Sequence, residues 1–274
     1  MLFRVISTFT IIAGLAQIGY CQDTTTQNPP SPQRPADTTN ATSGIDRPVG
    51  WTTIVPNILE DQKQIYWEFP RQLAHGKHWV PVAGVLAATA TLIATDQFDT
   101  RYFRRSSTFH GFNNAFSGTN ASLGILMAPL AMYGAGLVTH NSYAQKTALL
   151  SGEAVADSEI LDEILKLATR HARPESISPN GNFADTWFDS RTITDGGFPS
   201  GHTIAAFSVA TIVSDRYGHR HRWVPYVAYG LAATVGFSRV SWSAHSPADV
   251  VVGAVLGYAI SHFAVLHPSK RSDD

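Results

Sequence analysis

Cysteine is nearly absent from this sequence of 274 residues: Cys21 is the single one. One thiol cannot build the Cys/His clusters that hold structural zinc, so a zinc-finger type of fold is excluded. Cys21 also lies in an N-terminal segment that we expect to be removed on export. A mature chain without cysteine has no disulfide, and its stability outside the cytoplasm would depend on packing alone.

Charged residues are also scarce, at 15% of the chain against 44% apolar residues. The formal net charge of −1 gives no basic field, so we expect no nucleic-acid partner. Low charge combined with a large apolar fraction indicates extensive buried or lipid-facing surface.

Alternation of apolar and polar residues with period two is rare, which argues against a β-sheet protein. We predict an all-α fold, a six-helix bundle, from six segments with helical patterns. Three of them reach the lower edge of the length that spans a bilayer, about 17 residues. We favour a membrane-associated bundle, and the sequence leaves open whether its helices span the bilayer. The six segments are residues 79–95, 122–139, 142–172, 203–213, 224–237 and 250–266.

The first 50 residues differ in composition from the rest of the chain. Residues 1–21 have a positive start, an apolar run and small residues near Cys21, which predicts a secretory signal peptide. An uncleaved membrane anchor is the alternative. Residues 22–50 are rich in Thr, Pro, Asn and Asp and predict a disordered linker, which leaves residues 51–274 for the folded domain. We therefore expect an exported protein, periplasmic or membrane-associated.

The first motif with anion-binding chemistry contains Lys166, Arg173 and Pro174. A residue that precedes proline is pushed out of helical geometry, so the chain should leave its helix near Arg173. The two cations can then converge on one anion, Arg173 as a planar fork and Lys166 as a point charge. Cations also favour a helix C-terminus for electrostatic reasons, so this motif alone is weak evidence.

The second motif is the tetrapeptide Pro199-Ser200-Gly201-His202, followed by an apolar helical segment. Ser200 is a good N-cap, and Gly201 lets the backbone approach a ligand closely. The free N–H groups of a helix N-terminus form an anion site, which His202 in the first turn can face. A capped helix start with an incidental histidine is the alternative interpretation.

The third motif runs from Ser238 and Arg239 to His245, Ser246 and Asp249, between two apolar segments. Ser246 as N-cap and Asp249 three residues later predict a helix start. Asp249 could also accept the ring N–H of His245, which would fix its tautomer and leave the other nitrogen free to attack. Asp249 could cap the helix, orient the histidine, or do both.

Together the three motifs resemble the signature of the type 2 phosphatidic acid phosphatase (PAP2) superfamily, in its bacterial phosphatase branch. That superfamily includes lipid phosphatases, bacterial non-specific acid phosphatases and vanadium-dependent haloperoxidases. The three motifs occur in order, with no departure at a signature position, and the resemblance covers roughly residues 75–267.

The resemblance implies a metal-independent phosphohydrolase without a cofactor. His245 would be the nucleophile that forms a phosphohistidine, and Asp249 would orient it. His202 would donate a proton to the leaving oxygen and then activate water. The residues implied to bind the phosphoryl oxygens are Lys166, Arg173, Ser200, Gly201 and Arg239.

The substrate stays open at this stage. The apolar segments favour a lipid phosphate or a polyprenyl diphosphate, with the active site on the extracytoplasmic side. A soluble non-specific acid phosphatase, a vanadate-dependent haloperoxidase and a non-catalytic phosphate-binding protein are the alternatives. The loop at 175–197, which includes Phe183, Trp187 and Phe188, could contact a bulky leaving group. The remaining histidines, His262 and His267 among them, show no paired metal spacing, and we expect no metal site.

Overall fold

The computed structural model describes residues 47–106, 108–177, 187–188 and 196–268. Every regular element in these ranges is a helix, so the all-α prediction is confirmed for the described part of the chain. The predicted signal peptide, the linker up to residue 46 and Phe183 lie outside these ranges. Each of the six predicted segments is helical, and shorter helices precede or separate them.

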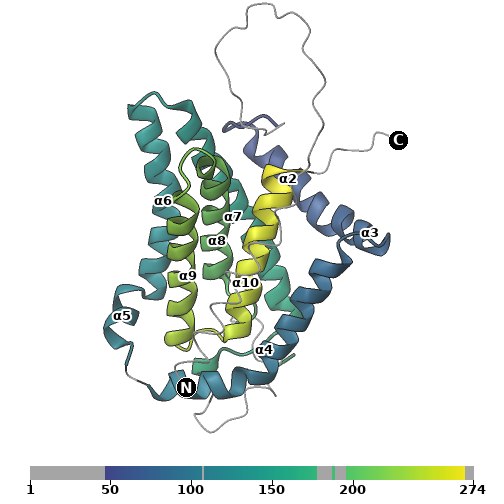
Figure 1. Cartoon of the computed structure of the whole chain (residues 1–274), viewed down its shortest axis with the longest axis vertical. Coiled ribbons are helices and arrows are strands. Elements are labelled where there is room, and N and C mark those ends of the chain that lie inside the picture. The colour runs from purple at the N-terminus through teal and green to yellow at the C-terminus, as the bar shows by residue number, and fades with distance from the viewer. Residues whose placement is uncertain (1–46, 107, 178–186, 189–195, 269–274) are drawn as a thin grey trace, which may run out of the picture. The chain divides into compact units, whose positions relative to one another are not determined.

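The helices follow one another in the order shown in Figure 1. The first part of the chain forms α2 (Ile54–Lys63), the π-helix η1 (Gln64–Glu68), α3 (Phe69–Ala74), α4 (Trp79–Arg105), α5 (His110–Ala115) and α6 (Gly118–Val138). The second part forms α7 (Ser142–Thr169), the short 3₁₀ turn η2 (Pro174–Ser176), α8 (Gly201–Gly218), α9 (Val224–Ser241), α10 (Pro247–Ala259) and the π-helix η5 (Ile260–Leu266).

Helix α8 is the centre of the bundle and packs against α7, α9 and α10 (Figure 1). Most of its residues are buried, and Ile204 and Ile212 are fully buried. Glycines on α10 allow the close approach: a Cβ atom at Gly253 would lie 2.9 Å from the Ser200 carbonyl oxygen. The bundle core therefore combines small residues at the close contact of α8 with α10 and larger apolar side chains around it.

Among the residues that the structure describes, three helices are long and apolar enough to cross a membrane by length and composition. They are Trp79–Asp96 in α4, Gly118–Val138 in α6 and Pro247–Leu266 in α10 and η5. These are the three segments whose length pointed to the bilayer in the sequence. The windows in α4 and α6 are only 6% and 17% buried inside the protein, so most of their apolar surface faces outward.

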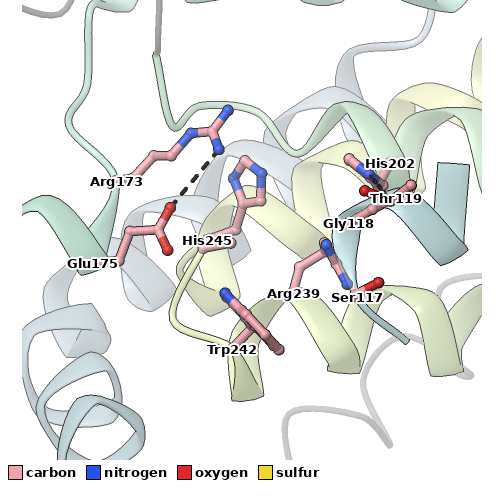
Figure 2. Close-up of a pocket in the computed structure, with 10 residues that line it drawn as sticks. Ser117, Gly118, Thr119, Arg173, Glu175, His202, Arg239, Trp242 and His245 are labelled. Atoms are coloured by element: carbon pink, nitrogen blue, oxygen red, sulfur yellow. Dashed lines mark hydrogen bonds and ion pairs between the residues drawn. The ribbon is translucent and has the colours of Figure 1, made fainter. Parts of the chain in front are cut away.

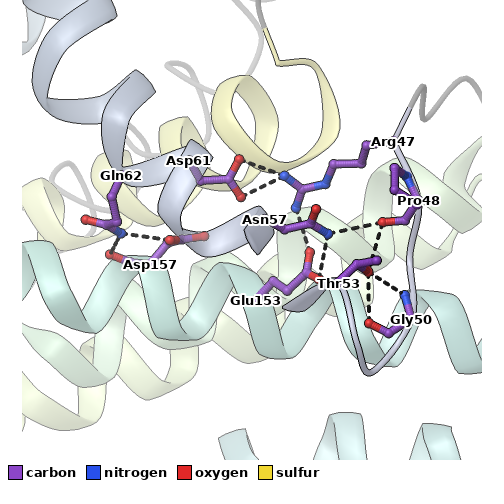
Figure 3. A network of polar contacts seen from close by, with 9 residues as sticks. All are labelled: Arg47, Pro48, Gly50, Thr53, Asn57, Asp61, Gln62, Glu153 and Asp157. Carbon is purple, nitrogen blue, oxygen red and sulfur yellow. Dashed lines mark hydrogen bonds and ion pairs between the residues drawn. The ribbon is translucent and has the colours of Figure 1, made fainter. Parts of the chain in front are cut away.

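A buried polar network joins the start of the described chain and α2 to α7 (Figure 3). Arg47 pairs with Asp61 at 2.6 Å and with Glu153 at 2.6 Å. The Gln62 side chain donates to Asp157 at 2.7 Å. Arg47 therefore belongs to the packed structure, ahead of the domain boundary that we predicted at residue 51.

Candidate active site

A cavity of about 320 Å³ lies where the starts of α6 and α8 meet the end of α9 (Figure 2). Arg173 and Glu175, which follow α7, and the turn between α9 and α10 complete its lining. Residues from all three sequence motifs reach it. Its lining consists of Ser117, Gly118, Thr119, Arg173, Glu175, His202, Arg239, Trp242, Ala244 and His245.

His245 lies in the turn between α9 and α10, where Ser243 has a positive φ of 65°. The side chain of His245 is 4% exposed, and its Nδ1 lies 2.6 Å from the carbonyl oxygen of Gly197. A carbonyl only accepts hydrogen bonds, so Nδ1 carries the proton and Nε2 keeps a lone pair. Gly197 thereby fixes the tautomer that leaves Nε2 as a nucleophile.

The electrostatics of the site keep His245 neutral. Burial, with a smaller contribution from the nearby Arg173 cation, lowers the pKa of its imidazole to about 3. At neutral pH the lone pair on Nε2 is therefore available without removal of a proton.

Asp249 lies behind His245 and is fully buried. Its Oδ2 accepts from the Ser246 backbone N–H at 2.7 Å, and the Ser246 hydroxyl accepts from the Asp249 N–H at 3.2 Å. This capping box starts α10. Asp249 Oδ2 lies 3.6 Å from His245 Nδ1, which is too far for a hydrogen bond but close enough to stabilise a positive charge on the ring if one forms. The direct hydrogen bond that we expected is thus made by the Gly197 carbonyl.

His202 occupies the first turn of α8 and faces the start of α6. Its Nε2 lies 2.9 Å from the Ser122 hydroxyl and 3.0 Å from the Gly118 carbonyl oxygen. Burial lowers the pKa of His202 to about 4, and the charges of Arg239 and Arg173 act in the same direction. In the empty pocket His202 is therefore neutral at pH 7.

Two guanidinium groups line the cavity. Arg239 is 3% exposed, and its side chain donates to the Phe116 carbonyl and to the Ser238 hydroxyl. A guanidinium nitrogen of Arg173 lies 3.9 Å from the carboxylate of Glu175, a residue that we did not predict to belong to the site. Both cations are held by the protein itself, so they are oriented before an anion enters.

Three residues that we expected to bind the phosphoryl oxygens, Lys166, Ser200 and Gly201, are not among those that line the cavity. The Lys166 ammonium group is 2.5 Å from the fully buried Asp162 and 3.2 Å from Glu163. Gly201 touches the same pair, since a Cβ there would lie 2.6 Å from the Asp162 carboxylate. Ser200 is fully buried at the N-cap of α8, and its backbone N–H donates to the Asp249 carbonyl at 3.1 Å.

The described part of the loop at 175–197 packs beside the site. Trp187 stacks on the buried ring of His171, with 3.9 Å between ring centroids, and meets Phe198 edge-on at 5.2 Å. Trp187 thereby contacts both His171 of the first motif and Phe198, the residue directly before the second motif. Phe188 is 65% exposed.

Comparison with known proteins identifies a family for the second half of the chain. Residues 147–273 match the PAP2 superfamily. This part of the chain belongs to the PAP2 superfamily. The matched segment of the PAP2 domain contains all three motifs, whereas the α6 residues that line the pocket lie outside it.

Curated relatives of the PAP2 domain are bacterial lipid A 1-phosphatases. The one from Porphyromonas gingivalis is 38% identical over 63 residues, which cover 23% of this chain and 14% of that protein. The one from Rhizobium etli is 35% identical over 106 residues, which cover 38% of this chain and 42% of that protein. The matches thus span less than half the length of these relatives.

One solved structure is also similar to the chain. It is a transmembrane PAP2 type phosphatidylglycerolphosphate phosphatase from Bacillus subtilis, with a TM-score of 0.48 and 20% identity. The similarity covers 66% of this chain and 92% of that one.

Several groups that contact the two histidines were not predicted from the sequence. The Gly197 carbonyl is a backbone group, and a sequence pattern does not show where it points. Gly118 and Ser122 belong to the start of α6, which we had interpreted as an apolar segment from residue 122 onward. The serine at position 117 was the signal in the sequence that α6 begins before residue 122. Ser117 is the N-cap of α6, and its hydroxyl accepts a hydrogen bond from the Asn120 backbone N–H.

Proposed function

We propose that this protein is a metal-independent phosphatase that forms a phosphohistidine on His245. One observation carries the proposal: the Nδ1 proton of His245 is donated to Gly197, in a cavity that Arg173 and Arg239 also line. A neutral nucleophile beside two fixed guanidinium groups suits phosphoryl transfer, which depends on positioning and on neutralising oxygen charge.

In the first step, Nε2 of His245 attacks phosphorus and the bond from phosphorus to the leaving oxygen breaks. The bonding electrons go to the leaving oxygen, which takes a proton from His202. His245 is then a phosphorylated imidazolium that keeps its Nδ1 proton and still donates it in a hydrogen bond to the Gly197 carbonyl oxygen. Asp249, 3.6 Å from Nδ1, stabilises that positive charge.

In the second step, His202 removes a proton from water and the oxygen attacks phosphorus. The phosphorus–nitrogen bond breaks, its electrons return to Nε2, and inorganic phosphate leaves. For this cycle His202 must be protonated when substrate binds. A phosphate dianion offsets the charges of Arg173 and Arg239, and so raises the pKa of His202 from its low value in the empty pocket.

The proposed substrate is a lipid phosphate or a polyprenyl diphosphate. A cavity of about 320 Å³ holds a phosphate head group and leaves the rest of a larger substrate outside. The three apolar helices support a membrane-borne substrate, as do the relatives named for lipid A 1-phosphate chemistry. The predicted signal peptide supports an active site on the extracytoplasmic side.

The proposal is tested by phosphate release in the presence of EDTA. Wild type and His245→Ala are compared on a lipid phosphate, a polyprenyl diphosphate and p-nitrophenyl phosphate, in detergent micelles. We expect release by the wild type, fastest with the lipid-borne substrates, and a rate at background for the variant. Equal rates in both proteins would rule out His245 as the nucleophile, and a preference for p-nitrophenyl phosphate would favour a soluble monoester as substrate.

A further inference from the structure

Three metal-ligand side chains converge outside the active site. Asp215 comes from the last turns of α8, and His262 and His267 come from η5 and its C-cap. Asp215 Oδ2 lies 3.2 Å from His262 Nδ1 and 3.4 Å from His267 Nε2. All three ligand atoms lie within 4.8 Å of one another.

From this cluster we propose a binding site for Zn²⁺ or a similar late first-row divalent cation. In a tetrahedral zinc site with bonds of about 2.0–2.1 Å, neighbouring ligand atoms are roughly 3.3–3.4 Å apart. The two distances to Asp215 Oδ2 already match that edge. Only the two histidine nitrogens must draw together, by rotation of side chains that are 25% and 52% exposed.

The π-helix is what brings the two histidines to one face. On an α-helix, residues five apart point in directions about 140° apart. In η5 the turn closes from residue 262 to 267: the His267 N–H donates to the His262 carbonyl at 3.0 Å. Single π-turns are rare and occur frequently at functional sites. Sequence spacing therefore gave no sign of this pair.

The donor chemistry selects the class of cation. Two imidazoles and one carboxylate favour zinc and its neighbours, whereas magnesium and calcium prefer oxygen ligands alone. Zinc binds a histidine through a nitrogen lone pair, so the Nδ1 proton that His262 donates to Asp215 must move to the other ring nitrogen when the cation binds. The Tyr258 ring stacks on His262 at an interplanar angle of 7° and holds it toward Asp215.

The site is separate from the phosphatase chemistry. Helix α8 starts beside the active-site cavity at Gly201, and Asp215 follows about 21 Å further along the helix, at 1.5 Å per residue. His262 is similarly about 22 Å beyond Pro247, the first residue of α10. A cation there would tie the end of α8 to η5 and stabilise the bundle, while phosphate release in EDTA would continue.

Zinc titration of the full-length chain in detergent tests the proposal, after chelator treatment and removal of any affinity tag. Isothermal calorimetry should show one Zn²⁺ per chain for the wild type, and thermal stability should rise with zinc concentration. Asp215→Asn, His262→Gln and His267→Gln should each weaken binding at least about 10-fold. His221→Gln, a change at an exposed histidine between α8 and α9, is the matched control and should bind like the wild type.

Cobalt spectroscopy of the wild type keeps the test independent of the variants' folding. A Co²⁺ spectrum with intense tetrahedral bands supports the site. A spectrum equal to that of hydrated Co²⁺ overturns the proposal. So does a wild-type zinc affinity weaker than about 1 mM, or binding by the three cluster variants that equals the wild type.

Discussion

Arg239 holds the structure together at the end of α9, and in the proposed mechanism it also binds the phosphoryl group. Its guanidinium is buried, is held by the Phe116 carbonyl and the Ser238 hydroxyl, and still lines the cavity. Arg239→Ala should lower kcat/KM by about 10²–10³, the usual cost of losing one preorganised donor to a developing oxyanion. Arg222→Ala, at an exposed position between α8 and α9, should leave it unchanged. Steady-state kinetics that show equal values for both variants would contradict the assignment.

His202 predicts an unusual pair of pH profiles. Activity needs His245 neutral, which holds above a pKa of about 3, and His202 protonated, which in the free enzyme holds only below about 4. The profile of kcat/KM should therefore fall as pH rises through the acidic range, because it reports the free enzyme. Bound phosphate raises the pKa of His202, so the fall in kcat should come at higher pH. Coincident profiles for the two parameters would contradict this role for His202.

At the scale of elements, α2 and α7 are joined by more buried acid than base (Figure 3). Among the described residues of the network, Arg47 is the one cation, and it pairs with Asp61 and Glu153. The third carboxyl group, that of Asp157, accepts a hydrogen bond from Gln62 instead. Burial raises the pKa of Asp157 from 3.8 to about 8, and the Asp61 carboxylate adds to the rise. The interior thus holds Asp157 in its protonated form at neutral pH.

This raised pKa predicts how stability depends on pH. Between about pH 4 and pH 8 the folded chain binds a proton at Asp157 that the unfolded chain has released, so stability falls as pH rises through this range. Asp157→Asn cannot ionise, so the variant should be more stable than the wild type at pH 8 and show a flatter profile. Thermal unfolding in detergent at several pH values measures both. A variant less stable than the wild type at pH 8 would contradict the account.

The elements themselves were largely predictable, since long uncharged segments and the caps at Ser200 and Ser246 mark the helices directly. The chemistry of the third motif was predictable only in part. The spacing predicted that Asp249 lies near His245. The hydrogen bond from Nδ1, however, is accepted by the backbone carbonyl of Gly197, which only the tertiary fold brings close. The π-helix η5 could not be predicted from the sequence. Helix propensity and the 3.6-residue period describe α-helices, and the change from α- to π-type hydrogen bonds leaves no pattern of residue types.

At the scale of the molecule, the active-site cavity and the loop between α8 and α9 lie at opposite ends of α8. If α4, α6 and α10 cross a bilayer, these two ends face opposite sides of it. Single cysteines introduced as Trp242→Cys or His221→Cys, in a Cys21→Ser background, show in whole cells on which side of the membrane each end lies. A membrane-impermeant maleimide should label Trp242→Cys in intact cells and His221→Cys only after permeabilisation. The reverse pattern would place the active site inside the cell.

The phosphohistidine is the central claim, and trapping it is the most direct test. His202→Ala should slow hydrolysis of the intermediate, because no base then activates water. Rapid quenching of this variant with ³²P-labelled p-nitrophenyl phosphate, whose leaving group needs no protonation, should give an acid-labile, alkali-stable label on the peptide that contains His245. The His202→Ala/His245→Ala double variant should give none. Wild-type turnover with no label at His245 in the trapping variant, or with label at another residue, would contradict the account.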